Sequence, residues 1–304
     1  MLVMEIPAKK VIFTSFAVDI LDIILSVIAT VLSGSMVMAS QILRGTVDLS
    51  ASGFLAVGIH RSQKSPDREH PFGYGRELYF WAMLSSLVIL GFTSTTSLYF
   101  GWRRFLNPEP ISDLSLAYLS LVIGAVTNGY AFSLSFRRLK RHWDAKDIWA
   151  IFFRSSLVET KTTFILDLMG TLASIFGLAA LIIYGITGDG RYDGLGAMVI
   201  GLLLGFFSLV LLVAVKDLLV GRGASPEMER QIFQASGTVS GVKKVLSVNT
   251  LYMGPEKLLV HVDVQIKNDL STQKIEEIIF AIKDNVKYWV KRASEIKVEI
   301  HKTP

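Results

Sequence analysis

Long apolar stretches with almost no charged residues occupy most of residues 11–215. A helix of about 20 apolar residues crosses the hydrocarbon core of a bilayer. Turn-forming runs such as Ser33-Gly34-Ser35 and Asn107-Pro108-Glu109-Pro110 separate these stretches. The sequence predicts six membrane-spanning helices, at Val11–Leu32, Met36–Ile59, Glu77–Phe100, Leu114–Phe136, Thr163–Ile186 and Leu195–Val215.

The remainder of the chain has the mixed composition of a soluble domain. Ser225-Pro226 predicts a helix start, with Ser as the cap. Val242–Val248 and Leu258–Ile266 alternate apolar and polar residues as strands do, Ser271–Val290 has helical spacing, and Glu295–His301 predicts a last strand. The expected fold is an all-α six-helix transmembrane bundle, residues 1–215, followed by a small cytoplasmic α+β domain, residues 216–304, in the order α-β-β-α-β.

Basic residues gather at one end of the predicted bundle, and Lys and Arg favour the cytoplasmic side of a membrane. With the N-terminus inside, the outer connections contain Arg103, Arg104 and Arg191. The inner segments contain Lys9, Lys10, Arg61, Lys64, Arg68, Arg76, Arg137, Arg138, Lys140, Arg141, Lys146, Arg154 and Lys161. Both termini are therefore expected in the cytoplasm. This asymmetry accounts for the formal net charge of +5. We therefore expect membrane lipid as a partner and no nucleic acid.

Ionisable residues inside the predicted spans are candidates for function, because charge is costly in hydrocarbon. The acidic candidates are Asp19, Asp22, Asp48 and Asp167. Gln41, Arg44 and Asp48 are three and four residues apart, so they share one helix face. Either this face forms a binding site, or Arg44 neutralises Asp48 or Asp167 and the cluster ties helices together. The chain has no cysteine, so a metal would need carboxylate, imidazole, hydroxyl or amide ligands.

Several motifs resemble the cation diffusion facilitator family. The run His70-Pro71-Phe72-Gly73-Tyr74-Gly75-Arg76 matches its signature, Ser33-Gly34-Ser35 precedes a polar second span, and Tyr192-Asp193-Gly194 begins span six. The resemblance covers nearly the whole chain. It implies a dimer that exports divalent metal ions, often in exchange for protons, and a C-terminal domain like small metal-carrying proteins. We expect a bacterial cytoplasmic membrane, or a membrane derived from it, and a divergent member such as a magnetosome-type paralogue.

The family's transport site differs here at two positions. It uses a His or Asp four residues before an Asp in spans two and five. Asp48 and Asp167 match the second members, whereas Arg44 and Thr163 replace the first. Two carboxylates beside a guanidinium give a net charge of about −1, and Thr163 or Gln41 would add only a neutral oxygen. Such oxygen ligands suit Mg, Mn or Fe better than Zn. The ion, transported or regulatory, is left open among Mn, Fe and Zn, but zinc by the usual route is not expected.

The resemblance implies two further metal sites. In the connection before span three, Asp67 and His70 match family ligands, while Tyr74 replaces a His; the alternative is a structural turn. In the C-terminal domain, Asp263, Glu276 and His301 correspond approximately to a site at the family's dimer interface. His261 alternates with Asp263 and shares its strand face. The alternative there is a solvated sheet face.

The sequence is compatible with more than one function. The leading hypothesis is a membrane cation transporter and not an enzyme. The second is a transport-inactive scaffold or regulatory subunit that pairs with a complete paralogue, since Arg44 places a permanent cation in the site. An intramembrane aspartyl protease would also need two membrane Asp residues, as Asp48 and Asp167 are. It leaves the soluble tail unexplained, and Tyr192-Asp193 is expected in an outer loop.

Overall fold

The computed structural model describes residues 8–141, 152–153, 156–268 and 270–301. The chain divides into two compact units, which we call the membrane unit (Met1–His60 and Phe80–Lys216) and the second unit (Arg61–Tyr79 and Asp217–Pro304). The sequence-based division into 1–215 and 216–304 did not anticipate that Arg61–Tyr79 associates with the second unit. The basic residues Lys146 and Arg154 lie outside the described residues.

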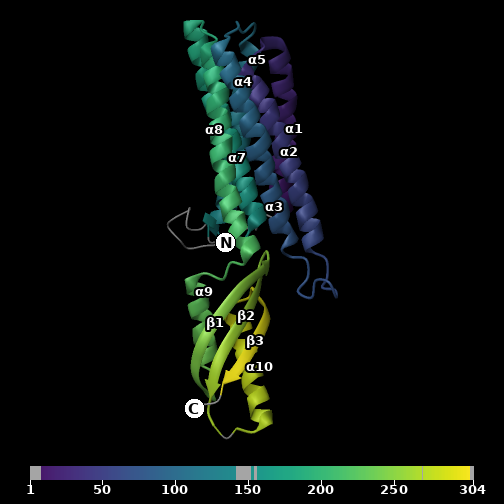
Figure 1. Ribbon diagram of the computed structural model, residues 1–304, viewed down its shortest axis with the longest axis vertical. Coiled ribbons are helices and arrows are strands. Elements are labelled where there is room, and N and C mark those ends of the chain that lie inside the picture. Colours follow the sequence, from purple (N-terminus) through teal and green to yellow (C-terminus); the bar gives the residue numbers. More distant parts are fainter. Residues whose placement is uncertain (1–7, 142–151, 154–155, 269, 302–304) are drawn as a thin grey trace, which may run out of the picture. The chain divides into compact units, whose positions relative to one another are not determined.

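Within the described residues, six helical segments are long and apolar enough to cross a membrane, which confirms the predicted bundle (Figure 1). They are formed by α1 (Ala8–Ser33), α2 (Met36–Ser62), the continuous run of α3 (Glu77–Val88), a π-helical segment (Ile89–Ser94) and α4 (Thr95–Leu106), then α5 (Ser115–Arg141), α7 (Val158–Thr187) and α8 (Arg191–Val220). Helix α5 packs along both α1 and α7.

Two predicted boundaries were wrong for the same reason. Helix α7 begins at Val158, not Thr163, and α8 begins at Arg191, not Leu195. Polar residues end an apolar window, but they do not end a helix whose first turns are buried in protein. Tyr192-Asp193 consequently lies in the first turn of α8 and not in an outer loop.

Small residues allow α8 to pack closely against the continuous helix formed by α3, the π-helical segment and α4. A Cβ on Gly194 would lie 2.6 Å from the backbone nitrogen of Phe105, and one on Gly201 would lie 3.0 Å from the backbone nitrogen of Leu98. The Ser94 hydroxyl donates to the carbonyl of Gly201 at 2.8 Å. Close backbone approach through Gly and Ser is a common way for helices to associate in lipid.

The C-terminal part of the second unit has the predicted α-β-β-α-β order: α9 (Pro226–Gly237), β1 (Val242–Gly254), β2 (Lys257–Ile266), α10 (Thr272–Trp289) and β3 (Ala293–His301). The Ser225 hydroxyl accepts from the Met228 amide, as the predicted cap requires. In the described sheet, β2 is central, antiparallel to β1 and parallel to β3. Helix α9 packs on β1 and α10 on β3 (Figure 1).

The central strand β2 separates two faces. Val260, Val262 and Val264 are buried, whereas His261 and Asp263 are half-buried. The buried face is covered by α9 and α10, whose buried residues include Ile232 and Ile282. The opposite face presents the polar side chains that the sequence placed together.

Candidate cation site

Arg44 is held at the centre of a buried polar group between α1, α2 and α5. Its Nη1 donates to Asp48 at 2.5 Å, its Nη2 donates to Asp22 at 2.9 Å, and its Nε donates to the Gln41 side-chain oxygen at 3.0 Å. The Arg44 residue is only 2% exposed. Asp22 also accepts a hydrogen bond from the side-chain amide nitrogen, Nδ2, of Asn128. The pairing with Asp48 follows the predicted i, i+4 spacing, but the pairing with Asp22 was not predicted.

Helical spacing arranges the polar residues in three layers along the bundle. Asp22 and Arg44 meet in the middle layer, which we call the arginine layer. Asp19 is one turn from Asp22, and Asp48 is one turn from Arg44 in the same direction. Asp167 joins them, because a Cβ on Gly170, one turn away in α7, would lie 2.7 Å from Arg44 Nη1.

We call Asp19, Asp48 and Asp167 the carboxylate layer. All are buried, and Asp19 interacts electrostatically with both of the others. Asp167 accepts a hydrogen bond of 2.7 Å from the Ser135 hydroxyl. Thr163 lies one turn before Asp167, but its hydroxyl donates to the carbonyls of Glu159 and Thr160 in its own helix. Thr163 could therefore contact a cation only through the lone pairs of its hydroxyl oxygen.

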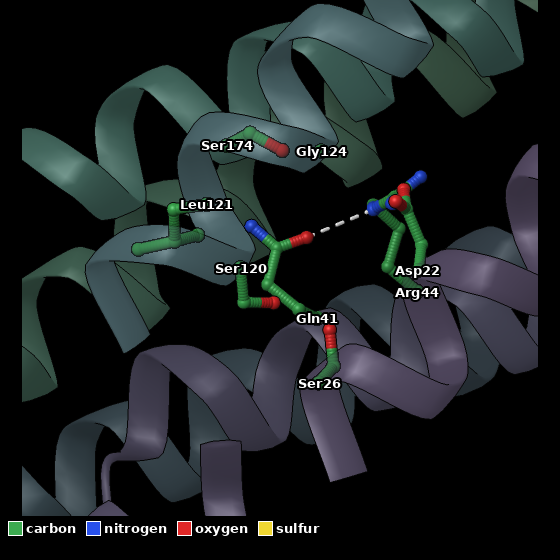
Figure 2. A pocket seen from close by; sticks show the side chains of 8 residues that line it. All are labelled: Asp22, Ser26, Gln41, Arg44, Ser120, Leu121, Gly124 and Ser174. Carbon is green, nitrogen blue, oxygen red and sulfur yellow. Dashed lines mark hydrogen bonds and ion pairs between the residues drawn. The ribbon is translucent and has the colours of Figure 1, made fainter. Parts of the chain in front are cut away.

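The third layer is a small polar cavity on the other side of Arg44, which we call the serine layer (Figure 2). Its volume is about 10 Å³, and it is lined by Asp22, Ser26, Gln41, Arg44, Ser120, Leu121, Gly124 and Ser174. Gln41 is 3% exposed, and its side-chain nitrogen has no hydrogen-bond partner among the described residues. Figure 2 shows this nitrogen on the cavity side and the oxygen directed at Arg44. The space suits a single water molecule.

The charge balance of the site differs from the sequence-based expectation. That expectation counted Asp48, Asp167 and Arg44, and gave a net charge of about −1. Asp19 and Asp22 add two buried carboxylates. With every group ionised, the cluster carries about −3. Arg44 pairs with Asp22 at 2.9 Å and with Asp48 at 2.5 Å, so its single positive charge offsets only part of this acidic charge.

The second predicted site, in the connection between α2 and α3, forms a closed turn. One Asp67 oxygen accepts from the His70 amide, and the other accepts from the Tyr74 hydroxyl, both at 2.7 Å. The His70 ring packs on the Tyr74 ring with 4.1 Å between centroids. The hydrogen bond from Tyr74, followed by that from His70, lowers the pKa of Asp67, and the Asp67 partner raises the pKa of Tyr74 to about 12.

The end of the signature run contacts other parts of the second unit. Arg76 donates to the carbonyl of Leu219 at 2.6 Å, where a cation stabilises the C-terminal end of helix α8. A Cβ on Gly75 would collide with the carbonyl oxygen of Met253 at the β1–β2 turn. Only glycine fits at position 75 without a shift of that turn.

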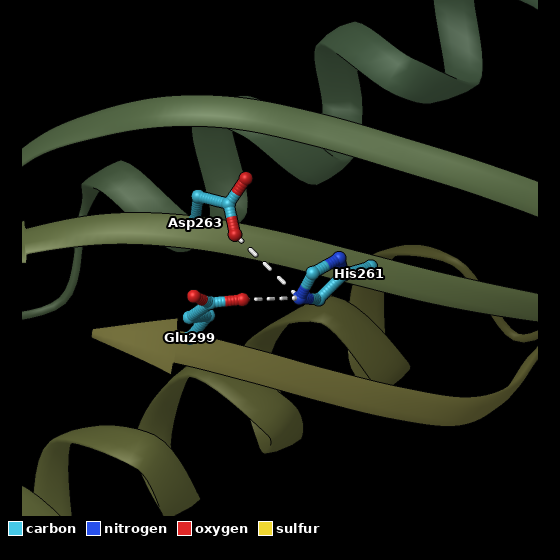
Figure 3. A group of neighbouring side chains, drawn as sticks. All are labelled: His261, Asp263 and Glu299. Atoms are coloured by element: carbon cyan, nitrogen blue, oxygen red, sulfur yellow. Dashed lines mark ion pairs between the residues drawn. The ribbon is translucent and has the colours of Figure 1, made fainter. Parts of the chain in front are cut away.

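The third predicted site is partly assembled on the polar face of the sheet (Figure 3). His261 Nε2 lies 3.5 Å from Asp263 and 3.3 Å from Glu299, and these three side chains could share one metal ion. His301 Nε2 lies 3.7 Å from the other oxygen of Glu299. Glu276 is exposed on α10, which covers the opposite face, so this chain does not bring it to Asp263. Glu299 was missed because its pairing opposite Asp263 depends on the β2–β3 register.

A buried acidic residue that the sequence analysis did not select lies at the other end of the membrane unit. Asp193, in α8, accepts from the Ser35 hydroxyl at 2.6 Å and from the amides of Met36 and Val37 at 2.7 and 2.9 Å. It also forms an ion pair of 3.3 Å with Arg104. Asp193 thus caps the first turn of α2 from another helix. In the sequence, only the Tyr192-Asp193-Gly194 motif pointed to Asp193.

A bundle of membrane-spanning helices with carboxylates buried on facing helices is typical of polytopic membrane transport proteins. The cation efflux transmembrane domain matches residues 12–220, and the chain belongs to that family, the cation diffusion facilitators. This confirms the predicted resemblance and the multi-pass topology. Members of the family are transporters and not enzymes, as expected.

The chain is similar to several named members. It is 26% identical over 270 residues to the human proton-coupled zinc antiporter SLC30A9, mitochondrial, covering 88% of this chain and 48% of that protein. It spans about half the length of these SLC30A9 relatives. It is 22% identical over 262 residues to the manganese efflux system protein MneP of Bacillus subtilis, covering 85% and 84%. A solved C-terminal domain of MamM matches 26% of this chain and 96% of that domain, with 19% identity and a TM-score of 0.24.

Proposed function

We propose that this protein moves a divalent cation across its membrane through the carboxylate layer of Asp19, Asp48 and Asp167. The observation that carries the proposal is the ion pair between Arg44 and Asp22. It balances the guanidinium with a carboxylate outside the predicted ligand pair. Three buried acidic groups on three helices then remain for the cation, and buried charges of this kind mark ion pathways in membrane proteins.

The ligand chemistry favours a hard cation. The carboxylate layer and its neighbour Ser135 offer oxygen atoms, and none of the described residues in the layer is a His. All-oxygen sites suit Mn²⁺ or Fe²⁺, whereas Zn²⁺ favours sites with nitrogen or sulfur ligands. One similar protein is named for manganese efflux and another for proton-coupled zinc antiport. We propose Mn²⁺ or Fe²⁺ efflux in exchange for protons.

Flux measurements in proteoliposomes test this proposal. Mn²⁺, Fe²⁺ and Zn²⁺ uptake is measured with and without a pH gradient for the unmodified protein and for Asp48→Asn and Asp167→Asn. We expect Mn²⁺ flux that depends on the gradient and falls at least about tenfold in each variant, because each loses a charged ligand. Thr46→Val is the matched control, since Thr46 is exposed on the same helix as Asp48. Flux that is absent, or equal in Asp48→Asn and the control, would reject transport by this route.

The remaining expectations extend this proposal. We propose a dimer, formed with a second copy or a paralogue, with both termini in the cytoplasm of a bacterium. The basic asymmetry of the sequence supports that orientation. We further propose that residues 216–304 act as a cytoplasmic regulatory domain that binds a metal through His261, Asp263 and Glu299, with His301 beside them. Glu276 would take part only from another chain.

We propose that Asp67, His70 and Tyr74 form a structural turn and not a metal site. Both oxygens of Asp67 already accept hydrogen bonds within the turn. A metal at Asp67 would have to displace the Tyr74 hydroxyl.

A second candidate function is the transport-inactive scaffold, favoured by the 2.5 Å contact between Arg44 and Asp48. In that case the guanidinium permanently occupies one ligand. The double variant Arg44→His, Thr163→His would then gain metal binding that the unmodified protein lacks. Calorimetric binding of Mn²⁺ by the unmodified protein that is lost in Asp48→Asn would exclude this candidate.

A further inference from the structure

Arg44 lies between the carboxylate layer and the serine layer and shares its two terminal nitrogens between two carboxylates. We infer that Arg44 is a tethered counter-cation that releases Asp48 when a dication binds and withdraws towards Asp22 and the serine layer. It would thereby set the affinity of the site without ligating the metal. This inference rests on the proposed function, because it assigns a role to the residue beside the proposed cation site.

The contacts of the guanidinium make such a movement possible. Nη1 bonds Asp48, while Nη2 bonds Asp22 and Nε bonds Gln41, so releasing Asp48 breaks one of three bonds. Asp22 is fixed from another helix by Asn128, whose amide nitrogen also donates to the Gly124 carbonyl at 2.9 Å. After release of Asp48, the guanidinium therefore still has acceptors in Asp22 and Gln41, towards which it can shift as a rigid group.

The surroundings offer Nη1 both space and new acceptors. The serine layer adjoins Arg44 and includes the hydroxyl groups of Ser26, Ser120 and Ser174. Its volume of about 10 Å³ accommodates roughly one small polar group. Gly170 on α7 faces Nη1 beside this cavity, and a Cβ at position 170 would lie 2.7 Å from Nη1. The unpartnered nitrogen of Gln41 requires an acceptor in the same cavity, which fits a water molecule whose oxygen can also accept from the guanidinium.

Electrostatics supplies the driving force. A dication on Asp48 would lie within a few ångströms of Nη1, which is 2.5 Å from the same carboxylate. Two like charges about 4 Å apart repel strongly in a site of low effective dielectric. The guanidinium cannot lose its proton, so it must move or weaken cation binding. The carboxylate of Asp22 determines how readily it moves.

The inference predicts opposite effects for the two partners. Asp22→Asn removes the anchor, so Arg44 competes for Asp48 and the apparent dissociation constant for Mn²⁺ rises about tenfold. Arg44→Gln removes the competitor, so the constant falls about tenfold and release slows, which lowers both KM and Vmax for transport. The double variant Asp22→Asn, Arg44→Gln removes an ion pair whole, and its affinity returns towards that of the unmodified protein.

The experiment is isothermal titration of purified full-length protein with Mn²⁺, following the binding that Asp48→Asn removes, together with transport kinetics in proteoliposomes. Thr46→Val on the same helix is the control. Arg44→Lys is the second variant if Arg44→Gln unfolds; it keeps the charge and should bind Mn²⁺ more weakly than the double variant does. Opposite shifts that cancel in the double variant support the inference. Shifts of the same sign, or no shift, overturn it while leaving the proposed function intact. If the unmodified protein binds no dication, both are overturned.

Discussion

Asp193→Asn tests whether the buried network at the start of α2 stabilises the membrane unit. Asp193 is 0% exposed and accepts from Ser35, Met36 and Val37. Asn keeps the shape of the side chain but replaces one acceptor oxygen with a donor, which would face an amide N–H of α2. It also removes the anion that faces Arg104 at 3.3 Å. The substitution therefore leaves part of the α2 start without an acceptor and a buried cation with less compensation.

The expected loss follows from these contacts. Removing one partner of a buried ion pair costs about 3–5 kcal/mol, since the other charge stays buried. The matched control is Glu109→Gln. Glu109 bonds the same Arg104 at 2.6 Å, but its side chain is 75% exposed. An exposed partner contributes only about 0–1 kcal/mol.

Equilibrium unfolding of the purified protein in mixed detergent, followed by tryptophan fluorescence, measures both losses. We expect the loss for Asp193→Asn to exceed that for Glu109→Gln by at least about 2 kcal/mol. Similar losses for the two variants, or a change below about 0.5 kcal/mol for Asp193→Asn, would refute the proposed role of burial.

Three further predictions concern the other groups. The tyrosinate absorbance that is present in the unmodified protein and missing in Tyr74→Phe should give Tyr74 a pKa of about 12. Because the folded protein raises this pKa, the hydrogen bond stabilises the turn fully below the ordinary tyrosine pKa of about 10. That stabilisation is lost as pH rises through about 12. Asp67→Asn should return that pKa towards its ordinary value, and an unchanged pKa would contradict the Asp67 bond. Gly170→Ala should unfold at a lower concentration of denaturing detergent, since its Cβ meets Asn128 and Arg44. Gly53→Ala is the control, because a Cβ there meets open space, and it should be neutral or slightly stabilising. Equal effects of the two variants would contradict close packing at Gly170. His261→Ala should weaken Mn²⁺ binding about tenfold at the proposed site of His261, Asp263 and Glu299 in the full chain, whereas Glu276→Ala should leave that binding unchanged.

Much of the fold was predictable because its signals are local. Hydropathy alone gives the membrane helices, since every helix must present about 20 apolar residues to lipid. Alternation along Leu258–Ile266 gives β2 and its polar face, and Ser225 gives the start of α9. Helix boundaries were less accurate wherever polar residues such as Asp193 are buried inside the protein.

The site was predictable only along single helices. Spacing of four residues pairs Arg44 with Asp48, and the structure contains that bond. The bond to Asp22 depends on the rotation of α1 against α2, which no spacing within one helix specifies. The same limit applies to Glu299, which reaches His261 only through the parallel pairing of β2 with β3.

The two substitutions that made the transport site look defective have different physical consequences. Thr163 replaces a ligand with a hydroxyl that is bonded to its own helix, so the site loses a ligand but gains no charge. Arg44 adds a charge, but Asp22 stands opposite it on α1 and neutralises that charge. The buried charges of all the facing helices show that Arg44 has an acidic partner in Asp22 as well as in Asp48. In the site we propose, this second partner offsets the guanidinium and leaves acidic charge for a cation, which an arginine without Asp22 would not.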